Sequence, residues 1–172
     1  MNHVQRWLVW LSRINKCRGF GIQSPTDYWI VRYVINEHWP YYQYDTIGLH
    51  DSWLRRKLGR LYFRIANWLQ PEVIVSDDYQ EYFHNGCCRA SFGAEGQLVR
   101  ITLDDHSLMN KECIYNKVRD DSVLIVEGIQ HFRNYWAELI ADERVRITFD
   151  LYYCGIVLFD KKRHKTNYIV NF

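Results

Sequence analysis

In the N-terminal part of the chain, apolar residues recur every three or four positions, which is the spacing of amphipathic helices. The first such stretch predicts a helix over residues 3 to 16. Ser24 and Pro25 suit an N-cap and a first helical position, so they predict a second helix that continues to about Glu37. The most regular apolar stripe predicts a third helix over residues 52 to 69.

Further along the chain, short apolar runs bounded by polar residues are typical of buried strands. Strands are expected at residues 72 to 76, 97 to 103, 122 to 127, 145 to 151 and 155 to 159, with a last extended segment at 167 to 172. Helices are expected within residues 79 to 92 and 107 to 119, and at 132 to 141. Because strands and helices alternate, we expect a mostly parallel sheet that closes with an antiparallel hairpin or meander.

Length and composition fit a single domain with a large core. The chain has 172 residues, of which 48% are hydrophobic, while glycine and proline are scarce. We expect residues 1 to 50 to form an N-terminal helical extension and residues 51 to 172 to form an α/β core. The formal net charge of +2 gives no strong global field, so it does not favour nucleic acid or a membrane surface as a partner.

The cysteines and the N-terminus indicate the compartment. The cysteines are Cys17, Cys87, Cys88, Cys113 and Cys154. Their number is odd and no C-x-x-C motif is present, so neither a disulfide framework nor a zinc site is indicated. Arginines interrupt the apolar N-terminus, and no apolar run approaches the ~20 residues of a membrane span. We therefore expect a cytoplasmic protein with reduced thiols and no bound metal.

Four short motifs occur together in this chain. They are Gly21-Ile22-Gln23-Ser24-Pro25, Gln70-Pro71, Glu127-Gly128, and the tail Asp150-Leu151-Tyr152-Tyr153-Cys154-Gly155-Ile156-Val157-Leu158-Phe159. In combination they resemble a bacterial branch of the class I S-adenosylmethionine-dependent methyltransferases, over roughly residues 18 to 75 and 97 to 172. The resemblance implies a Rossmann-like methyltransferase-type α/β sheet that is mostly parallel and closes with an antiparallel hairpin strand. It also implies S-adenosylmethionine as a cofactor.

The chain departs from this family where the cofactor would bind. The family carries an acid and a glycine-bearing turn after the first strand, because the cofactor must approach bare backbone. Here the turn reads Ser76-Asp77-Asp78-Tyr79-Gln80-Glu81-Tyr82, and the next glycine is Gly86. The roughly twenty residues before the next strand are too few for two further strand and helix units. We therefore expect a reduced strand number, with the second and third strands deleted, and a turn that cannot cradle the cofactor.

The resemblance implies three cofactor-binding candidates, Asp77, Asp104 and Glu127. Asp77 is a remnant of the turn acid, whereas Asp104 and Glu127 follow neighbouring parallel strands, at the edge where open α/β sheets bind ligands. A second alignment makes 97 to 103 the second strand and Asp104 the acid that grips the ribose. His106 and His131 are catalytic candidates as acid–base groups. The alternative is that these acids are polar strand ends and the histidines lie on the surface.

A row of arginines on the third helix is the candidate partner-binding surface. Arg56, Arg60 and Arg64 are spaced by four residues, which gives one basic face opposite the leucine stripe. Such a face could contact phosphate or an acidic partner, or it could simply be solvated.

These observations favour one function and leave two alternatives. The first is a degenerate, non-catalytic methyltransferase-like domain that has no cofactor and acts as a binding or scaffolding module, with an unknown protein partner or through self-association. The second is an active S-adenosylmethionine-dependent methyltransferase with a small-molecule or macromolecular acceptor. The third is an RNA-contacting accessory protein that uses the arginine row.

Overall fold

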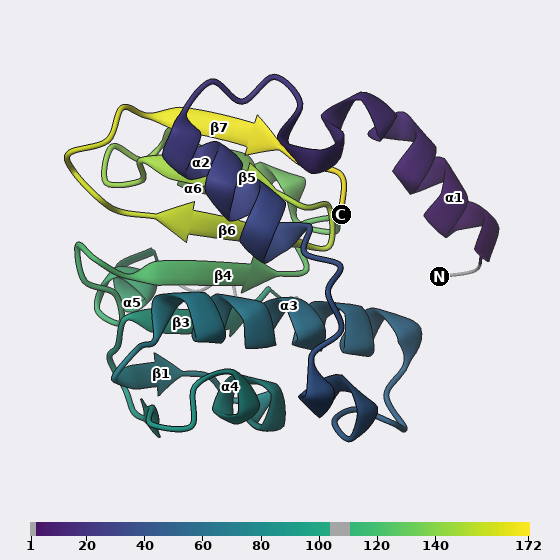
Figure 1. Cartoon of the computed structure of the whole chain (residues 1–172). Coiled ribbons are helices and arrows are strands. Elements are labelled where there is room, and N and C mark those ends of the chain that lie inside the picture. The colour runs from purple at the N-terminus through teal and green to yellow at the C-terminus, as the bar shows by residue number, and fades with distance from the viewer. Residues whose placement is uncertain (1–2, 104–110) are drawn as a thin grey trace.

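A seven-stranded mixed sheet organises the chain, and its strands lie in the order β2-β1-β3-β4-β6-β5-β7 (Figure 1). In this computed structural model, residues 3 to 103 and 111 to 172 are described. The strands are β1 (Val73–Val75), β2 (Ser91–Phe92), β3 (Leu98–Thr102), β4 (Val123–Glu127), β5 (Ile147–Asp150), β6 (Cys154–Leu158) and β7 (Thr166–Ile169). Pairing is parallel from β2 to β4 and antiparallel on both sides of β6, and β5 pairs with β7 in parallel. The predicted α/β class and the terminal hairpin are therefore confirmed.

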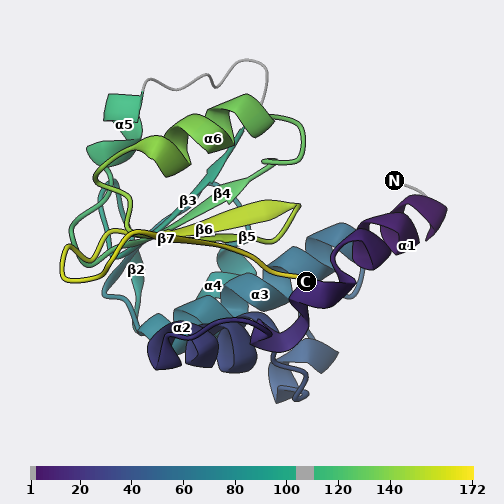
Figure 2. The same cartoon turned by 90° about the horizontal axis from the view of Figure 1, so that it is seen from above.

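Helices cover both faces of this sheet. The α-helices are α1 (His3–Ser12), α2 (Pro25–Ile30), α3 (Trp53–Leu69), α4 (Gln80–Gly86), α5 (Lys111–Tyr115) and α6 (Arg133–Ala141). Shorter turns of 3-10 helix (Ile14–Gly19 and Tyr42–Asp45) and π-helix (Val31–Ile35) lie between them. Figure 2 shows α2, α3 and α4 on one face and α5 and α6 on the other. Each face has its own buried apolar cluster.

The best-defined helix, α3, forms for the reasons that its sequence indicates. The Ser52 hydroxyl accepts from the backbone N–H of Arg55 at 3.3 Å, which caps the N-terminus. Leu58, Leu61 and Ile65 are buried against the sheet. At the other end Gln70 adopts a left-handed conformation, so the chain turns directly into the strand that follows.

The end of the chain differs from the predicted topology in one respect. Because β6 lies between β4 and β5, both of its edges are occupied, and the last strand cannot continue a meander beside it. The chain instead passes β5, and β7 pairs in parallel with the edge of β5 that faces away from β6. The described part of the chain forms seven strands, counting the two-residue β2, so the total number of strands is not low, and the expected deletion of the second and third strands concerns the segment between β1 and β3. The segment between β1 and β3 nevertheless holds only α4 and the two-residue β2.

The first predicted helix is shorter than expected, and its apolar face points outward. α1 ends at Ser12 because Arg13 leaves helical geometry and donates to the carbonyl and carboxylate of Asp150, at 2.9 and 2.8 Å. Val4, Trp7 and Leu8 are more than 60% exposed on a helix that extends beyond the sheet (Figure 1). None of the helices in the described part of the chain is long and apolar enough to cross a membrane.

Candidate functional site

An arginine at the centre of β3 joins two of the predicted site residues. The side chain of Arg100 is 4% exposed, and its guanidinium donates through Nε and Nη2 to Oε2 of Glu127, at 3.1 and 2.7 Å. Its Nη1 donates to Oδ1 of Asp77 at 2.7 Å. Glu127 ends β4 and is 18% exposed, whereas the Asp77 side chain after β1 is 81% exposed. Asp77 and Glu127 therefore meet through a buried cation at the carboxyl ends of the strands.

Two tyrosines complete this cluster. The hydroxyl of Tyr62 donates to Oε2 of Glu127 at 3.0 Å, and that of Tyr79 donates to Oε1 at 3.3 Å. The guanidinium carbon of Arg100 lies 4.8 Å from the ring centroid of Tyr79. Burial, and then the Glu127 charge, raises the pKa of the Tyr79 hydroxyl, so this hydroxyl stays a donor. Both carboxylate oxygens of Glu127 are therefore already bonded within the protein. We call Tyr62, Asp77, Tyr79, Arg100 and Glu127 the strand-end cluster.

The turn after β1 keeps a glycine-type backbone but carries a tyrosine. Tyr79 has φ 59°, in the left-handed region that favours glycine, and the residue is only 5% exposed. Asp78 holds this conformation because its Oδ1 accepts from the Tyr79 N–H at 2.7 Å. Hydrogen bonds from Arg55 lower the pKa of Asp78 to about 2. The turn therefore presents a buried ring instead of open backbone.

Gly59 on α3 allows the neighbouring Tyr82 ring to pack tightly. A Cβ at Gly59 would lie 2.5 Å from Cζ of Tyr82, whose hydroxyl donates to Oδ2 of Asp51 at 2.7 Å. In an exposed helix, alanine would stabilise this position by about 1 kcal/mol. Here we expect Gly59→Ala to lower the free energy of unfolding by about 1–3 kcal/mol, because the ring has no room to move.

Urea denaturation would measure this effect. In a Tyr82→Ala background the same Gly59→Ala substitution should be neutral or stabilising, since the obstructing ring is gone. A stabilising effect of Gly59→Ala in the otherwise unchanged protein would contradict the packing described here.

Of the remaining predicted site residues, Asp104 and His106 lie outside the described residues. His131 is exposed in the turn after β4 and lines a cavity of about 620 Å³ with Leu8 and Tyr152, rather than the strand-end cluster. Arg100 was not predicted as a site residue from the sequence. The signal was its position, since it is the one charged residue in the apolar run of residues 98 to 101. A charge buried in such a strand needs a partner of opposite charge nearby.

The arginine row on α3 is engaged within the chain. Arg64 is buried and donates to the carbonyl oxygens of Val34 and Ile35, at 2.6 and 2.8 Å. Arg60 donates to the carbonyl of Tyr44 at 3.4 Å. Arg56 donates to the carbonyls of Gly48, Leu49 and Asp51. The row therefore holds residues 34 to 51 against α3, and all of these acceptors are neutral carbonyls.

Comparison with known proteins adds no family assignment. No protein-family model, curated protein or solved structure matches this chain. Within the described residues, no group of three or more His, Cys, Asp or Glu side chains is arranged to hold a metal ion. Five cavities in the described part of the chain share no lining residue with the strand-end cluster.

Proposed function

We propose that this protein is a non-catalytic binding or scaffolding module built on a methyltransferase-like α/β sheet. One observation carries the proposal, namely that the strand-end cluster fills the corner where an open sheet of this type binds its ligand. A functional nucleotide-binding site at the strand ends exposes backbone groups and hydrogen-bond acceptors that have no partner in the protein. This one offers a buried Tyr79 ring and a carboxylate whose oxygens already accept hydrogen bonds.

The strand order supports the methyltransferase-like part of the proposal. In the Rossmann order of doubly wound sheets the first strand lies between the second and the fourth, whereas in the flavodoxin-like order it lies between the second and the third. β3 lies between β1 and β4, which is the position of a fourth strand in the Rossmann order, and the opposite side of β1 is occupied only by the two-residue β2. This arrangement favours the loss of two strand and helix units over the alignment in which residues 97 to 103 are the second strand. The antiparallel β6 between β4 and β5 fits the hairpin that closes the family's sheet.

The energetics of the corner support the non-catalytic part. A cofactor in the corner would have to displace Tyr79 and separate Glu127 from Arg100. Separating this ion pair costs free energy unless the ligand itself pairs with both charges, and that cost would be subtracted from any binding. An RNA contact through the arginine row has less support, since Arg56, Arg60 and Arg64 already donate to backbone carbonyls. An unknown protein partner and self-association stay predictions.

Titration with S-adenosylmethionine and S-adenosylhomocysteine tests the proposal. A ligand at 100 times its Kd raises the free energy of unfolding by about 2.7 kcal/mol, which a thermal melt registers readily. We expect no shift of the melting temperature with either ligand at millimolar concentration, and no heat of binding by calorimetry. A methyltransferase of known affinity, measured in parallel, serves as the positive control. Saturable binding with a Kd in the micromolar range would support the active methyltransferase instead.

A further inference from the structure

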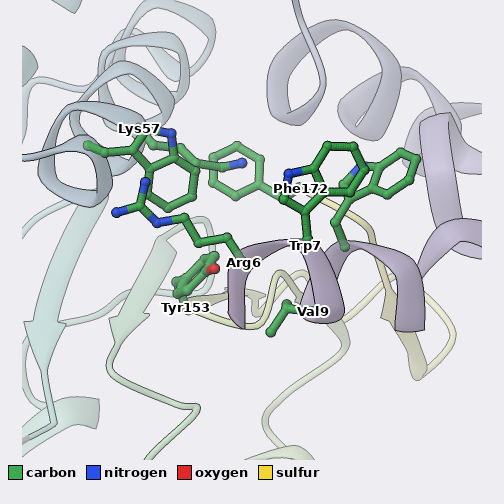
Figure 3. Close-up of a pocket in the computed structure, with 8 residues that line it drawn as sticks. Arg6, Trp7, Val9, Lys57, Tyr153 and Phe172 are labelled. Carbon is green, nitrogen blue, oxygen red and sulfur yellow. The ribbon is translucent and has the colours of Figure 1, made fainter. Parts of the chain in front are cut away.

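Two adjoining cavities lie along α3 beside Phe172, away from the strand-end cluster; α1 borders the first and residues 35 to 38 border the second. The first has a volume of about 350 Å³, and its walls include Trp7, Trp10, Trp53 and Phe172 (Figure 3). The second has a volume of about 420 Å³, and Arg56, Arg60 and Arg64 line it. Trp53, Lys57 and Phe172 line both, so the two cavities share a wall. We call them the aromatic cavity and the basic cavity.

The aromatic cavity has the composition of a ligand site. Sites for small molecules are typically about 300–1,000 Å³ and are lined mainly by apolar and aromatic groups, with a few polar groups that orient the ligand. Here the rings of Trp7 and Trp10 lie 6.0 Å apart at 73°, and those of Trp53 and Tyr153 lie 6.1 Å apart at 79°. The charged groups in its lining are Arg6 and Lys57, and no Asp or Glu lines it.

Among the described residues, the cations of the basic cavity form no ion pair with a carboxylate. None of the ion pairs among the described residues includes Arg56, Lys57, Arg60 or Arg64. The acid in this lining is Glu37, which accepts from the hydroxyl of Tyr41 at 3.2 Å. Four positive charges within nine consecutive residues of α3 therefore produce a potential that favours an anion.

Lys57 is the cation best placed to contact a ligand. Its Nζ lies 4.5 Å from the ring centroid of Phe172 and 5.1 Å from that of Trp53, in the shared wall. Figure 3 shows its side chain beside those of Arg6 and Phe172. The arginines of the row donate hydrogen bonds to backbone carbonyls. Among the described residues, by contrast, the Lys57 ammonium donates no hydrogen bond to another group. Burial, and then the charge of Arg64, lowers the pKa of Lys57 to about 8.

We propose that the two cavities form one binding site for a small aromatic anion, whose ring lies among the tryptophans and whose anionic group contacts Lys57. An aromatic ring would bury its faces against Trp7, Trp10 and Trp53. A carboxylate, sulfonate or phosphate would provide the missing counter-charge to the ammonium. The site goes beyond the proposed function and does not depend on whether the corner at the strand ends is closed.

Two fluorescent probes that differ mainly in charge test this site. The first is 8-anilinonaphthalene-1-sulfonate, and the second is the neutral N-phenyl-1-naphthylamine, which lacks the sulfonate. We expect the sulfonate to bind with a stoichiometry near one, and Lys57→Met to weaken it at least about 10-fold, which corresponds to about 1.4 kcal/mol. Binding of the neutral amine should change less than about twofold on the same substitution, since it depends on apolar contact. Trp53→Ala should weaken both probes.

Lys162→Met is the matched control, because Lys162 is exposed and lines a different cavity with Leu158 and Phe159. It should leave the binding of both probes unchanged. A thermal melt of each variant at the same protein concentration establishes that it is folded. The proposal is overturned if Lys57→Met leaves sulfonate binding unchanged, if both probes bind with equal affinity, or if the control weakens sulfonate binding as strongly.

The pH dependence gives a second readout. Above its pKa, Lys57 loses its charge, so sulfonate affinity should fall between pH 7 and pH 10 in the unchanged protein and stay constant in Lys57→Met. The other charged or titratable groups that face this region are Arg6, Glu37, His38, Arg56, Arg60, Arg64, Tyr153 and Cys154. The difference between the protein and its variant isolates Lys57 from these groups. A parallel fall in both would overturn the assignment of the anionic contact to Lys57.

Discussion

Replacing Arg100 by methionine is expected to lower the free energy of unfolding by up to about 3–5 kcal/mol, because it leaves the largely buried carboxylate of Glu127, 18% exposed, without its cation. Arg100 is 4% exposed and makes two bonds to Glu127, whose remaining partners are the Tyr62 and Tyr79 hydroxyls. Those neutral donors cannot replace a full positive charge. Equilibrium urea denaturation of the two proteins measures the difference.

A double variant separates this charge effect from lost packing. Adding Glu127→Gln removes the unpaired charge, so Arg100→Met with Glu127→Gln should be more stable than Arg100→Met alone. Arg144→Met is the matched surface control, because its pair with Asp142 is formed by a side chain that is 53% exposed, and it should cost less than about 1 kcal/mol. An Arg100→Met protein within 1 kcal/mol of the unchanged protein would show that the strand-end cluster contributes little.

The second large effect is expected for Arg64→Leu. Arg64 satisfies the carbonyls of Val34 and Ile35 at the end of a turn of π-helix, in a part of the chain that is buried. A buried acceptor without a partner costs about 1–3 kcal/mol, so the loss of both bonds should lower the free energy of unfolding by about 2–6 kcal/mol. Urea denaturation gives the total effect.

Hydrogen exchange locates the same effect. Backbone amides of Val31–Ile35 should exchange faster in Arg64→Leu, while those of β4 should be affected only through the global change. Arg56→Leu is the control from the same row, since it bonds carbonyls of residues 48 to 51 in more exposed surroundings, and its effect should be less than half as large. Equal effects of the two substitutions would contradict the structural role assigned to Arg64.

The elements that could be predicted from sequence are those whose residues interact locally. The helix at 52 to 69 follows from a stripe, an N-cap serine and a terminal proline that lie within one segment, and α3 has those bounds to within one residue. The strand at 122 to 127 follows in the same way from a continuous apolar run. The sequence also predicts that tyrosine side chains take the place of open backbone in the turn after β1, and Tyr79 is buried at that position.

What could not be predicted depends on contacts between distant segments. The direction of β7 follows from the insertion of β6 between β4 and β5, which no local pattern of residues 166 to 169 contains. The arginine row looks solvated on a helical projection, yet Arg64 is buried because residues 34 and 35 pack over it. The cluster around Arg100 joins the ends of β1 and β4, the middle of β3 and α3, so its members become neighbours only in the folded sheet.

The position of Trp136 makes it an internal optical reporter. Of the seven tryptophans, all of which are described, it alone is buried, at 3% exposure, and its indole packs directly over the Cα of Gly155 in β6. Of the other six, Trp7, Trp10, Trp29, Trp39 and Trp53 are exposed, and Trp68 at the end of α3 is half-buried against the core. The blue edge of the intrinsic emission therefore reports on the layer that contains α6, and the red edge reports on the N-terminal helices. Recording both during one unfolding experiment distinguishes loss of the sheet from detachment of the helices that border the aromatic cavity.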